Sequence, residues 1–302
     1  MGTKATIEKH DANPLLSRAK SLLRSYGLRA RKGLGQHFLV DKETLGRVVA
    51  AAELTNSDII LEVGSGLGVL TRELVKKAGW VLAIELDDKL AAILEDTLKS
   101  FGNVSVVNKS ILEVDLTSLL QENKAKFPSS VNTTCCYKMV ANLPYYITFP
   151  VLRYFLEASL KPHTMVVMVQ KEVAESIVAG PGQMSMLSIS VQFYGEPEII
   201  SYVQAKAFYP VPEVDSAILR IKTYAQPRLD VGDINGFFDL VRAGFTASRK
   251  QIANSLVQGL KLPKADILSL LKKAEITPQR RAEALMLDEW ARLWQIFTEV
   301  GK

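Results

Sequence analysis

A glycine-rich turn is the first segment whose residues could do chemistry. Residues 62–68 have the sequence EVGSGLG, in which Gly64 and Gly66 let the backbone approach a ligand closely. Glu85 follows Gly64 by 21 residues, a position from which a carboxylate can accept hydrogen bonds from ribose hydroxyls. The G-x-G-x-G spacing differs from the G-x-G-x-x-G of dinucleotide-binding proteins. The turn and its acid predict a nucleoside site, and the alternative is a tight turn with a structural carboxylate.

An Asn-Leu-Pro-Tyr segment could act on the amine of a base. The lone pair of an adenine amine is delocalised into the ring, which makes this amine a poor nucleophile. The side-chain oxygen of Asn142 and the carbonyl of Leu143, held by Pro144, could accept the two amine hydrogens, while Tyr145 stacks on the base. Two such acceptors favour a pyramidal nitrogen that points its lone pair at an electrophile. The alternative is a proline-terminated strand with packed tyrosines.

Alternating strands and helices must position these two segments. Short apolar runs predict buried strands at residues 59–63, 80–86, 104–107, 138–141 and 165–169. Helical spacing lies between them, at residues 69–77, 88–99 and 149–158. This alternation predicts a parallel α/β sheet, in which ligands bind at the carboxyl ends of the strands. Two further runs, 199–203 and 217–222, have no obvious helix between them and predict an antiparallel hairpin at the sheet edge.

The two ends of the chain have a different, helical character. A basic amphipathic helix is expected to begin at Asn13-Pro14 and to end at Gly27. The polar stretch 121–134 is expected to be a loop insertion, and residues 230–236 are expected to form a linker. Helical spacing then covers residues 237–259 and 264–274, and a final helix that carries Trp290 and Trp294 is expected to be capped by Thr277-Pro278.

Charge is spread unevenly along the chain. The formal charge is +5 overall, but residues 1–35 carry +6, residues 36–241 carry −6 and residues 242–281 carry +7. Two basic segments around an acidic middle indicate a polyanionic partner, with a merely solvated basic surface as the alternative.

Several features of the sequence concern location and metals. No apolar run reaches the ~18–20 residues that span a bilayer, and the N-terminal residues contain no stretch of signal-peptide type. The two cysteines, Cys135 and Cys136, are adjacent and match neither a disulfide framework nor a zinc spacing. These features predict a cytoplasmic protein without a membrane partner and without a metal.

Together the motifs resemble those of a known enzyme family. An acid followed by G-x-G-x-G is similar to the signature of S-adenosylmethionine-dependent methyltransferases, and Asn-Leu-Pro-Tyr is similar to that of N6-adenine methyltransferases. Residues 35–39 (GQHFL), 170–174 (QKEVA), 208–217 (FYPVPEVDSA) and 245–256 (FTASRKQIANSL) resemble the ribosomal RNA adenine dimethyltransferases. The resemblance implies an α/β fold, namely a Rossmann-like class I S-adenosylmethionine-dependent methyltransferase sheet followed by a smaller all-helical domain. The expected divisions are a basic segment 1–35, a catalytic domain 36–228 and a helical RNA-binding domain 229–302.

The same resemblance assigns roles to individual residues. It implies that the cofactor S-adenosylmethionine is bound by Gln36, His37, Leu39, Glu62, Gly64, Gly66, Glu85, Ser110 and Asn142. It implies that the target adenine is bound and oriented by Asn142, Leu143, Pro144, Tyr145 and Phe208. Basic residues expected to contact RNA phosphates are Arg29, Arg31, Lys32, Arg249, Lys250, Arg280 and Arg281.

Two positions depart from the family pattern. Ser110 stands where the family usually has an aspartate that accepts a hydrogen bond from the cofactor adenine, so the acceptor here carries no charge. Ser248 stands where an arginine is common, which removes one candidate phosphate contact.

The implied activity is dimethylation of the N6 amines of two adjacent adenosines near the 3′ end of small-subunit (16S) rRNA. The implied partner is that rRNA within a pre-30S particle, and the enzyme is expected to act as a monomer that contributes to small-subunit biogenesis. A related large-subunit rRNA methyltransferase, an assembly or transcription factor that has lost catalysis, and a nicotinamide-dependent oxidoreductase are the alternatives. The basic N-terminus, the intact Asn142–Tyr145 segment and the glycine spacing argue against them in that order.

Overall fold

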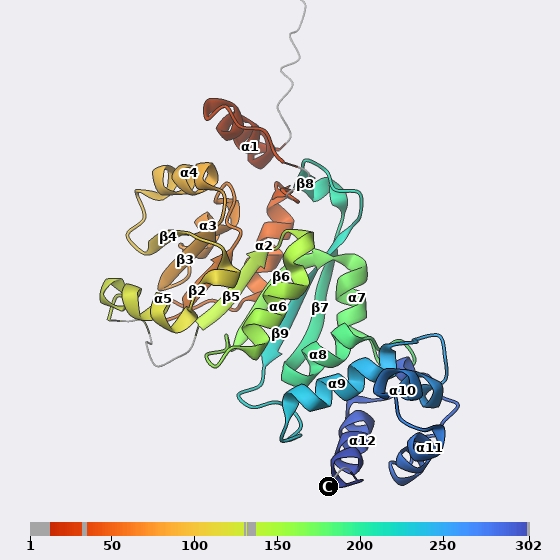
Figure 1. Ribbon diagram of the computed structural model, residues 1–302. Coiled ribbons are helices and arrows are strands. Elements are labelled where there is room, and N and C mark those ends of the chain that lie inside the picture. The colour runs from red at the N-terminus through yellow and green to blue at the C-terminus, as the bar shows by residue number, and fades with distance from the viewer. Residues whose placement is uncertain (1–12, 32–34, 130, 132–136, 301–302) are drawn as a thin grey trace, which may run out of the picture. The chain divides into compact units, whose positions relative to one another are not determined.

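The computed structural model describes residues 13–31, 35–129, 131 and 137–300 (Figure 1). The chain divides into two compact units. The first comprises Met1–Tyr146 and Val203–Ser216, and the second comprises Ile147–Tyr202 and Ala217–Lys302. The limits expected from the sequence, 36–228 and 229–302, stay a prediction. Cys135 and Cys136 lie outside the described residues.

A parallel sheet forms the centre of the first unit. Its strands, in the order β4-β3-β2-β5, are β4 (Val104–Asn108), β3 (Trp80–Glu85), β2 (Ile59–Val63) and β5 (Tyr137–Asn142). All three pairings are parallel, and Ile59 lies opposite both Trp80 and Tyr137. Every residue of β2 and β3 is buried, which explains why their sequences are nearly uninterrupted apolar runs. The predicted parallel sheet is therefore confirmed, and the carboxyl ends of β2, β3 and β5 lie next to one another.

The described residues of the first unit form five α-helices. They are α1 (Pro14–Ser25), α2 (Lys42–Ala51), α3 (Val69–Leu74), α4 (Asp88–Leu98) and α5 (Leu116–Asn123). Aspartates cap the N-termini of α2, α4 and α5, and each accepts hydrogen bonds from the first turn of its helix. The loop expected at 121–134 is partly wrong, because α5 continues to Asn123 and is followed by a 3-10 turn, Lys124–Lys126. Helix α5 forms there because Asp115 caps it while Leu116 and Leu119 are buried.

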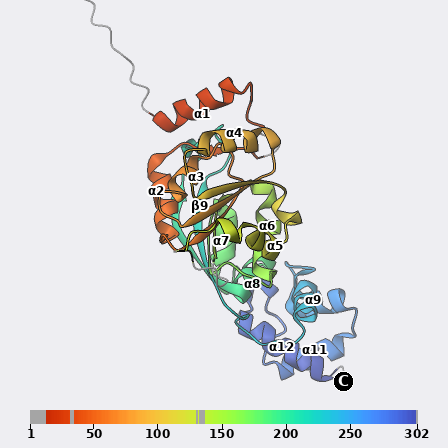
Figure 2. The same ribbon diagram turned by 90° about the vertical axis from the view of Figure 1, so that its left-hand side faces the viewer.

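Helix α1 lies against α4, as both views show (Figures 1 and 2). The predicted start of α1 is confirmed, since the side chain of Asn13 accepts a hydrogen bond from the backbone N–H of Leu16. Ala19 and Leu23 belong to the same apolar cluster as Leu90 and Ile93 of α4. The helix is therefore fixed to the unit by its apolar face.

A two-stranded sheet was not expected from the sequence. Strand β1 (Phe38–Leu39) pairs antiparallel with β8 (Phe208–Tyr209), which places Leu39 opposite Phe208. Strands of two residues are too short to show an alternating pattern. This small sheet joins the segments 35–39 and 208–217 that the sequence marked as motifs.

The second unit contains three strands and three helices before its C-terminal part. The strands lie in the order β6 (Thr164–Gln170), β9 (Ser216–Thr223) and β7 (Gly195–Val203), and the helices are α6 (Thr148–Glu157), α7 (Lys171–Val178) and α8 (Met186–Tyr194). Strands β7 and β9 are neighbours, and β7 is the last strand in this order, as expected of the two runs without a helix between them.

The C-terminal part is helical, as predicted, but two of its details differ. Its helices are α9 (Ile234–Phe245), α10 (Ile252–Leu260), α11 (Lys264–Lys273) and α12 (Leu287–Val300). The single helical stretch expected at 237–259 is two helices, and the expected linker 230–236 contains Asp233, the N-cap of α9. The expectation that Thr277-Pro278 caps the last helix is wrong, since the carbonyls of both residues accept turn and loop hydrogen bonds and α12 begins nine residues after Pro278, at Leu287. In the part of the chain that the structure describes, no helix has both the length and the apolar composition to cross a membrane.

Candidate active site

The glycine turn leads from the end of β2 into α3 and lies against the end of β3. Gly64, Gly66 and Gly68 have φ angles of +71°, +57° and +72°, a region in which other residues are strained. The N–H of Gly64 donates to the carbonyl of Ile84 at 2.8 Å. A Cβ atom on Gly66 would lie only 3.1 Å from the ring of Phe38. Conformation thus favours glycine at all three positions, and the space beside the turn is also tight at Gly66 and Gly68.

Glu85 holds this turn in place. Its carboxylate accepts the N–H of Gly66 at 2.8 Å and the N–H of Asp87 at 3.0 Å, one on each oxygen. The side chain is 8% exposed, and burial raises the pKa of Glu85 above its usual value. Each carboxylate oxygen has a second lone pair, so both can accept a further hydrogen bond from a ligand hydroxyl.

Glu62 is a buried carboxyl group with an oxygen that has no partner. It is 1% exposed, and among the described residues no donor reaches its Oε2 atom. Burial raises the pKa of Glu62 to about 7, although the adjacent Thr71 and Ser65 oppose this rise and the charge of Glu85 adds to it. A buried acid of this kind favours a cationic ligand group, which would both neutralise its charge and donate to Oε2.

Asn142 ends β5 and has its amide oriented by a distant segment. Its Nδ2 atom donates to the carbonyl oxygen of His37 at 2.9 Å. This bond engages the amide nitrogen and leaves the Oδ1 atom to accept a hydrogen bond from a ligand. Pro144 lies beside the glycine turn, with 3.5 Å between its Cδ atom and the Cβ position of Gly64. The two motifs found in the sequence are therefore neighbours in the first unit.

Tyr145 is held by contacts on its ring and on its hydroxyl. Its ring stacks on the imidazole of His37 at a centroid distance of 5.8 Å, and its hydroxyl is hydrogen-bonded to Ser216 Oγ at 2.8 Å. Burial raises the pKa of Tyr145 above 10.0, so the phenol is neutral at physiological pH. His37 in turn donates from Nδ1 to the carbonyl of Pro210 at 2.7 Å. Sequence reasoning missed the roles of Ser216 and Pro210, although both belong to the 208–217 motif.

The remaining predicted site residues are placed less directly. Leu39 and Phe208 are buried opposite each other in the small sheet, with Phe208 only 2% exposed. The side chain of Gln36 accepts the N–H of Arg31 at 2.8 Å and thereby closes the loop before β1. Ser110 is half-buried just after β4, two residues beyond Asn108, which donates to the backbone carbonyl of Glu85 at 2.9 Å. The cofactor and adenine contacts expected of these residues stay predictions.

The predicted phosphate-binding residues fall into two groups, one in each unit. In the first unit Arg29 is exposed and Arg31 lies 3.6 Å from Asp87, while Lys32 lies outside the described residues. In the second unit the N–H of Ile252 donates to the carbonyl of Arg280 at 2.6 Å, which brings the loop with Arg249 and Lys250 close to residues 280–281.

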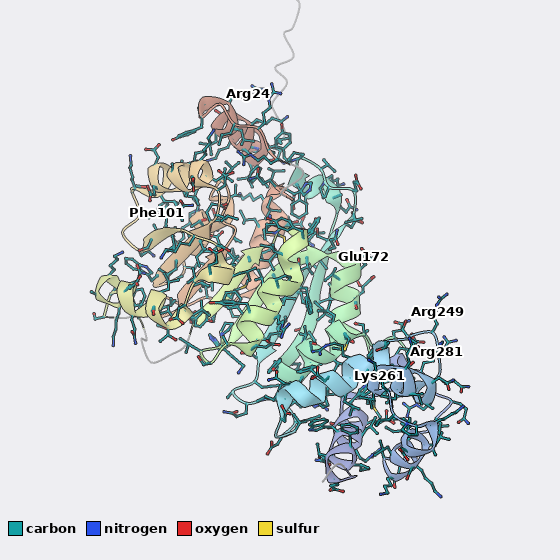
Figure 3. The ribbon with its side chains drawn as sticks, in the orientation of Figure 1. Arg24, Phe101, Glu172, Arg249, Lys261 and Arg281 are labelled. Atoms are coloured by element: carbon teal, nitrogen blue, oxygen red, sulfur yellow. The ribbon has the colours of Figure 1, made fainter. Side chains whose placement is uncertain are left out.

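The side chains of this second group differ in what they contact. Arg249, Lys250 and Arg281 are exposed, and Arg249 and Arg281 project from the helical part in Figure 3. Arg280 forms an ion pair with Glu289, and its Nη2 atom also donates to the carbonyl of Ala284. Arg281 Nη1 lies 3.6 Å from Glu283, so both arginines have an acidic partner within the unit, and their phosphate contacts stay predictions.

The chain is similar to known proteins over nearly its whole length. Residues 27–299 match the family model described as "Ribosomal RNA adenine dimethylase". The chain is 48% identical over 285 residues to the "Ribosomal RNA small subunit methyltransferase A" of Dehalococcoides mccartyi, covering 94% of each chain. It is 38% identical over 292 residues to the protein of the same name from Bacillus pumilus, covering 95% of this chain and 97% of that protein.

Two solved structures are similar over most of the chain. The 23S rRNA methyltransferase ErmE has a TM-score of 0.66 and 29% identity, covering 86% of this chain and 99% of ErmE. A dimethyladenosine transferase from Plasmodium falciparum has a TM-score of 0.71 and 23% identity, covering 88% and 98%. These likenesses confirm the predicted class I methyltransferase fold.

Proposed function

The chain belongs to the ribosomal RNA adenine dimethylase family, and from this premise we propose that it dimethylates N6 amines of adenines in small-subunit rRNA with S-adenosylmethionine as methyl donor. The observation that carries the proposal is the Asn142 amide, whose nitrogen is bound to the His37 carbonyl and whose oxygen is left for a substrate amine beside the glycine turn. We further propose that the targets are two adjacent adenosines near the 3′ end of 16S rRNA in a pre-30S particle. We also propose that the enzyme acts as a monomer in the cytoplasm.

The residues of the glycine turn fit the proposed cofactor. The ribose hydroxyls of S-adenosylmethionine would donate to the two oxygens of Glu85. The ammonium group of the cofactor would donate to Glu62 Oε2, which has no other donor among the described residues. The backbone at Gly64 and Gly66 would allow its close approach. Ser110 would accept from its adenine. When bound, S-adenosylmethionine supplies an electrophilic methyl group on a sulfonium sulfur.

The Asn142–Tyr145 segment would orient the target amine. Asn142 Oδ1 and the Leu143 carbonyl accept its two hydrogens, so the nitrogen lone pair is directed at the methyl group. Tyr145, fixed by His37 and Ser216, stacks on the base. The two acceptors would also stabilise the positive charge that the nitrogen carries once it is methylated. The nitrogen releases its proton to solvent after transfer, so no strong base is required.

A second candidate substrate is large-subunit rRNA. The likeness to the 23S rRNA methyltransferase ErmE favours it, at 29% identity. Relatives named for the small subunit are more similar, at 38% and 48% identity, and support the first candidate. The intact Asn142–Tyr145 segment argues against a factor without catalysis.

Methylation of isolated ribosomal subunits tests the proposal. Unmethylated small and large subunits are incubated with the protein and S-adenosylmethionine, and the nucleosides are analysed by mass spectrometry. We expect N6,N6-dimethyladenosine in small-subunit rRNA only, and its appearance only in large-subunit rRNA would overturn the small-subunit assignment.

A variant of Asn142 tests the mechanism in the same assay. Asn142→Ala should slow single-turnover methylation by ~10²–10³, because one preorganised acceptor is lost. Asn56→Ala is the matched control, since Asn56 is exposed in the loop before β2, at the opposite end of the sheet. RNA affinity should change little in both variants. Near-normal transfer by Asn142→Ala would remove this residue from the mechanism.

A further inference from the structure

A basic groove runs along helix α1, outside the site described above. It has a volume of about 560 Å³ and is lined by Leu16, Ser17, Lys20, Ser21, Arg24 and Ser25. The segment 13–31 contains five basic residues and no acidic one, and the acidic residues Asp96 and Asp87 contact it after the helix, at Tyr26 and Arg31. Arg24, labelled in Figure 3, is exposed on this helix. The groove thus combines positive charge with serine hydroxyl groups, a combination suited to an anionic ligand.

The helix that carries the groove is fixed at three points. At its start, Nδ2 of Asn13 donates to the carbonyl of Val40 at 2.8 Å. In its middle, Ala19 and Leu23 are buried in the cluster that contains Leu90 and Ile93. After its end, the hydroxyl of Tyr26 donates to Asp96 at 2.7 Å. The apolar face is therefore occupied within the unit, which leaves the polar groove as the face for a partner and disfavours insertion into a lipid surface.

The groove is connected to the proposed catalytic residues through the small sheet. Lys20 Nζ lies 5.4 Å from the centroid of the Tyr209 ring. Tyr209 pairs with Phe38 across β8 and β1, and the carbonyl of the following residue, Pro210, accepts the Nδ1 proton of His37. A chain bound in the groove would thus pass close to the segment that orients Asn142.

We propose that this α1 groove binds the phosphate backbone of the RNA strand that flanks the target adenine. Lys20 and Arg24 contact phosphates, and Ser21 donates a hydrogen bond to a phosphate oxygen. These two basic residues are one helical turn apart, about 6 Å along the axis, which is comparable to the separation of successive phosphates on a strand. The inference deepens the proposed function and rests on it, because it presumes an RNA substrate.

Salt-dependent RNA binding by matched charge variants tests the groove. Lys20→Gln/Arg24→Gln removes both proposed contacts, and Arg18→Gln removes one equal charge from an exposed position of the same helix. Arg18 does not line the groove. It lies near Arg72, whose pKa is lowered by burial and then by the charge of Arg18. The probes are unmethylated small subunits and a synthetic RNA stem-loop with two adjacent adenosines in its loop.

The expected effects follow from counterion release. The double variant should lower the slope of log affinity against log salt by about 1.4–1.8, and should weaken binding by ~25–60-fold at about 0.1 M salt. Arg24→Gln alone leaves the contact of Lys20 with Tyr209 in place and should give about half of the slope change. Arg18→Gln should change the slope by less than about 0.3. Cofactor affinity should be unchanged in Arg24→Gln.

Three results would overturn the inference. An unchanged slope in both groove variants would show that Lys20 and Arg24 do not contact phosphates. An equal slope change in Arg18→Gln would show that the effect comes from the overall positive charge of the helix and not from the groove. Competition by polyglutamate as strong as that by the stem-loop would assign the groove to acidic protein segments. Failure of the unaltered protein to methylate small subunits is a separate result, which would overturn the proposed function while the binding comparison still decides the groove.

Discussion

Replacing Glu62 by glutamine should stabilise the protein and weaken its cofactor binding at the same time. The pKa of Glu62 is about 7 in the folded chain against 4.5 as an ordinary glutamate, because the carboxyl is buried. Its protonated form therefore favours folding, and ionisation costs stability as the pH rises from 4.5 to about 7. At 1.36 kcal/mol per pH unit this cost reaches about 3 kcal/mol at pH 8 and is below about 1 kcal/mol at pH 5.

Glutamine has nearly the same shape but cannot ionise. We expect Glu62→Gln to raise the free energy of unfolding by up to about 3 kcal/mol at pH 8 and to leave it nearly unchanged at pH 5. The amide no longer pairs with the cofactor ammonium, so S-adenosylmethionine affinity should fall by about 1–3 kcal/mol. Urea unfolding of the ligand-free protein at both pH values and calorimetric titration measure these two effects.

Glu95 provides a control for the substitution of Glu62. Glu95→Gln removes an acid from an exposed position on α4, and it should change neither quantity by more than ~0.5 kcal/mol. If Glu62→Gln lowered stability equally at pH 5 and pH 8, the carboxyl would be ionised and well solvated in the folded chain. Glu62 would then show no preference for a cationic ligand group.

Three further predictions concern other residues of the first unit. Ser110→Asp should tighten S-adenosylmethionine binding by about 0.5–1.5 kcal/mol in a calorimetric titration, and a large loss would mean that Ser110 is not in the adenine pocket. Glu85→Ala should weaken the same binding by about 1–3 kcal/mol, because the N–H groups of Gly66 and Asp87 also lose their acceptor, and unchanged affinity would exclude Glu85 from the cofactor site. Lys138→Met should reduce the free energy of unfolding by about 3–5 kcal/mol at pH 7, because Asp58, which accepts from Lys138 Nζ at 2.9 Å, loses its buried partner; a loss below about 1 kcal/mol would contradict this.

The sequence was most informative where burial alone determines the pattern. Residues 59–63 are an apolar run because both faces of β2 are covered, and the predicted limits agree with the structure. The break between α9 and α10 was not predicted, because residues 246–251 contain neither the glycine nor the proline that commonly marks the end of a helix. The cap expected at Thr277-Pro278 was wrong because the prediction used only the local sequence. In the structure the carbonyl of Pro278 accepts a hydrogen bond from the N–H of Ala253, a residue distant in the chain.

Part of the site could be predicted from the sequence, because the order of the strands determines which residues meet. Glu62, Glu85 and Asn142 end neighbouring parallel strands, so the topology alone brings them together. The orientation of Asn142 could not be predicted, because it depends on the carbonyl of a residue 105 positions earlier in the chain. The same holds for Tyr145 and Ser216, whose hydrogen bond joins residues 71 positions apart.

The bond between Asn142 and His37 has a consequence for how the enzyme tolerates mutation. The acceptor is a main-chain oxygen, and every amino acid carries one in that place. A scan that exchanges the side chain at position 37 would therefore leave the amide of Asn142 correctly turned, although it would remove the imidazole that stacks on Tyr145. A deletion or insertion of one residue before β1 would instead displace the oxygen itself. The position is thus permissive to substitution and intolerant of length change, and only experiments that shift the backbone would reveal how much the reaction depends on it.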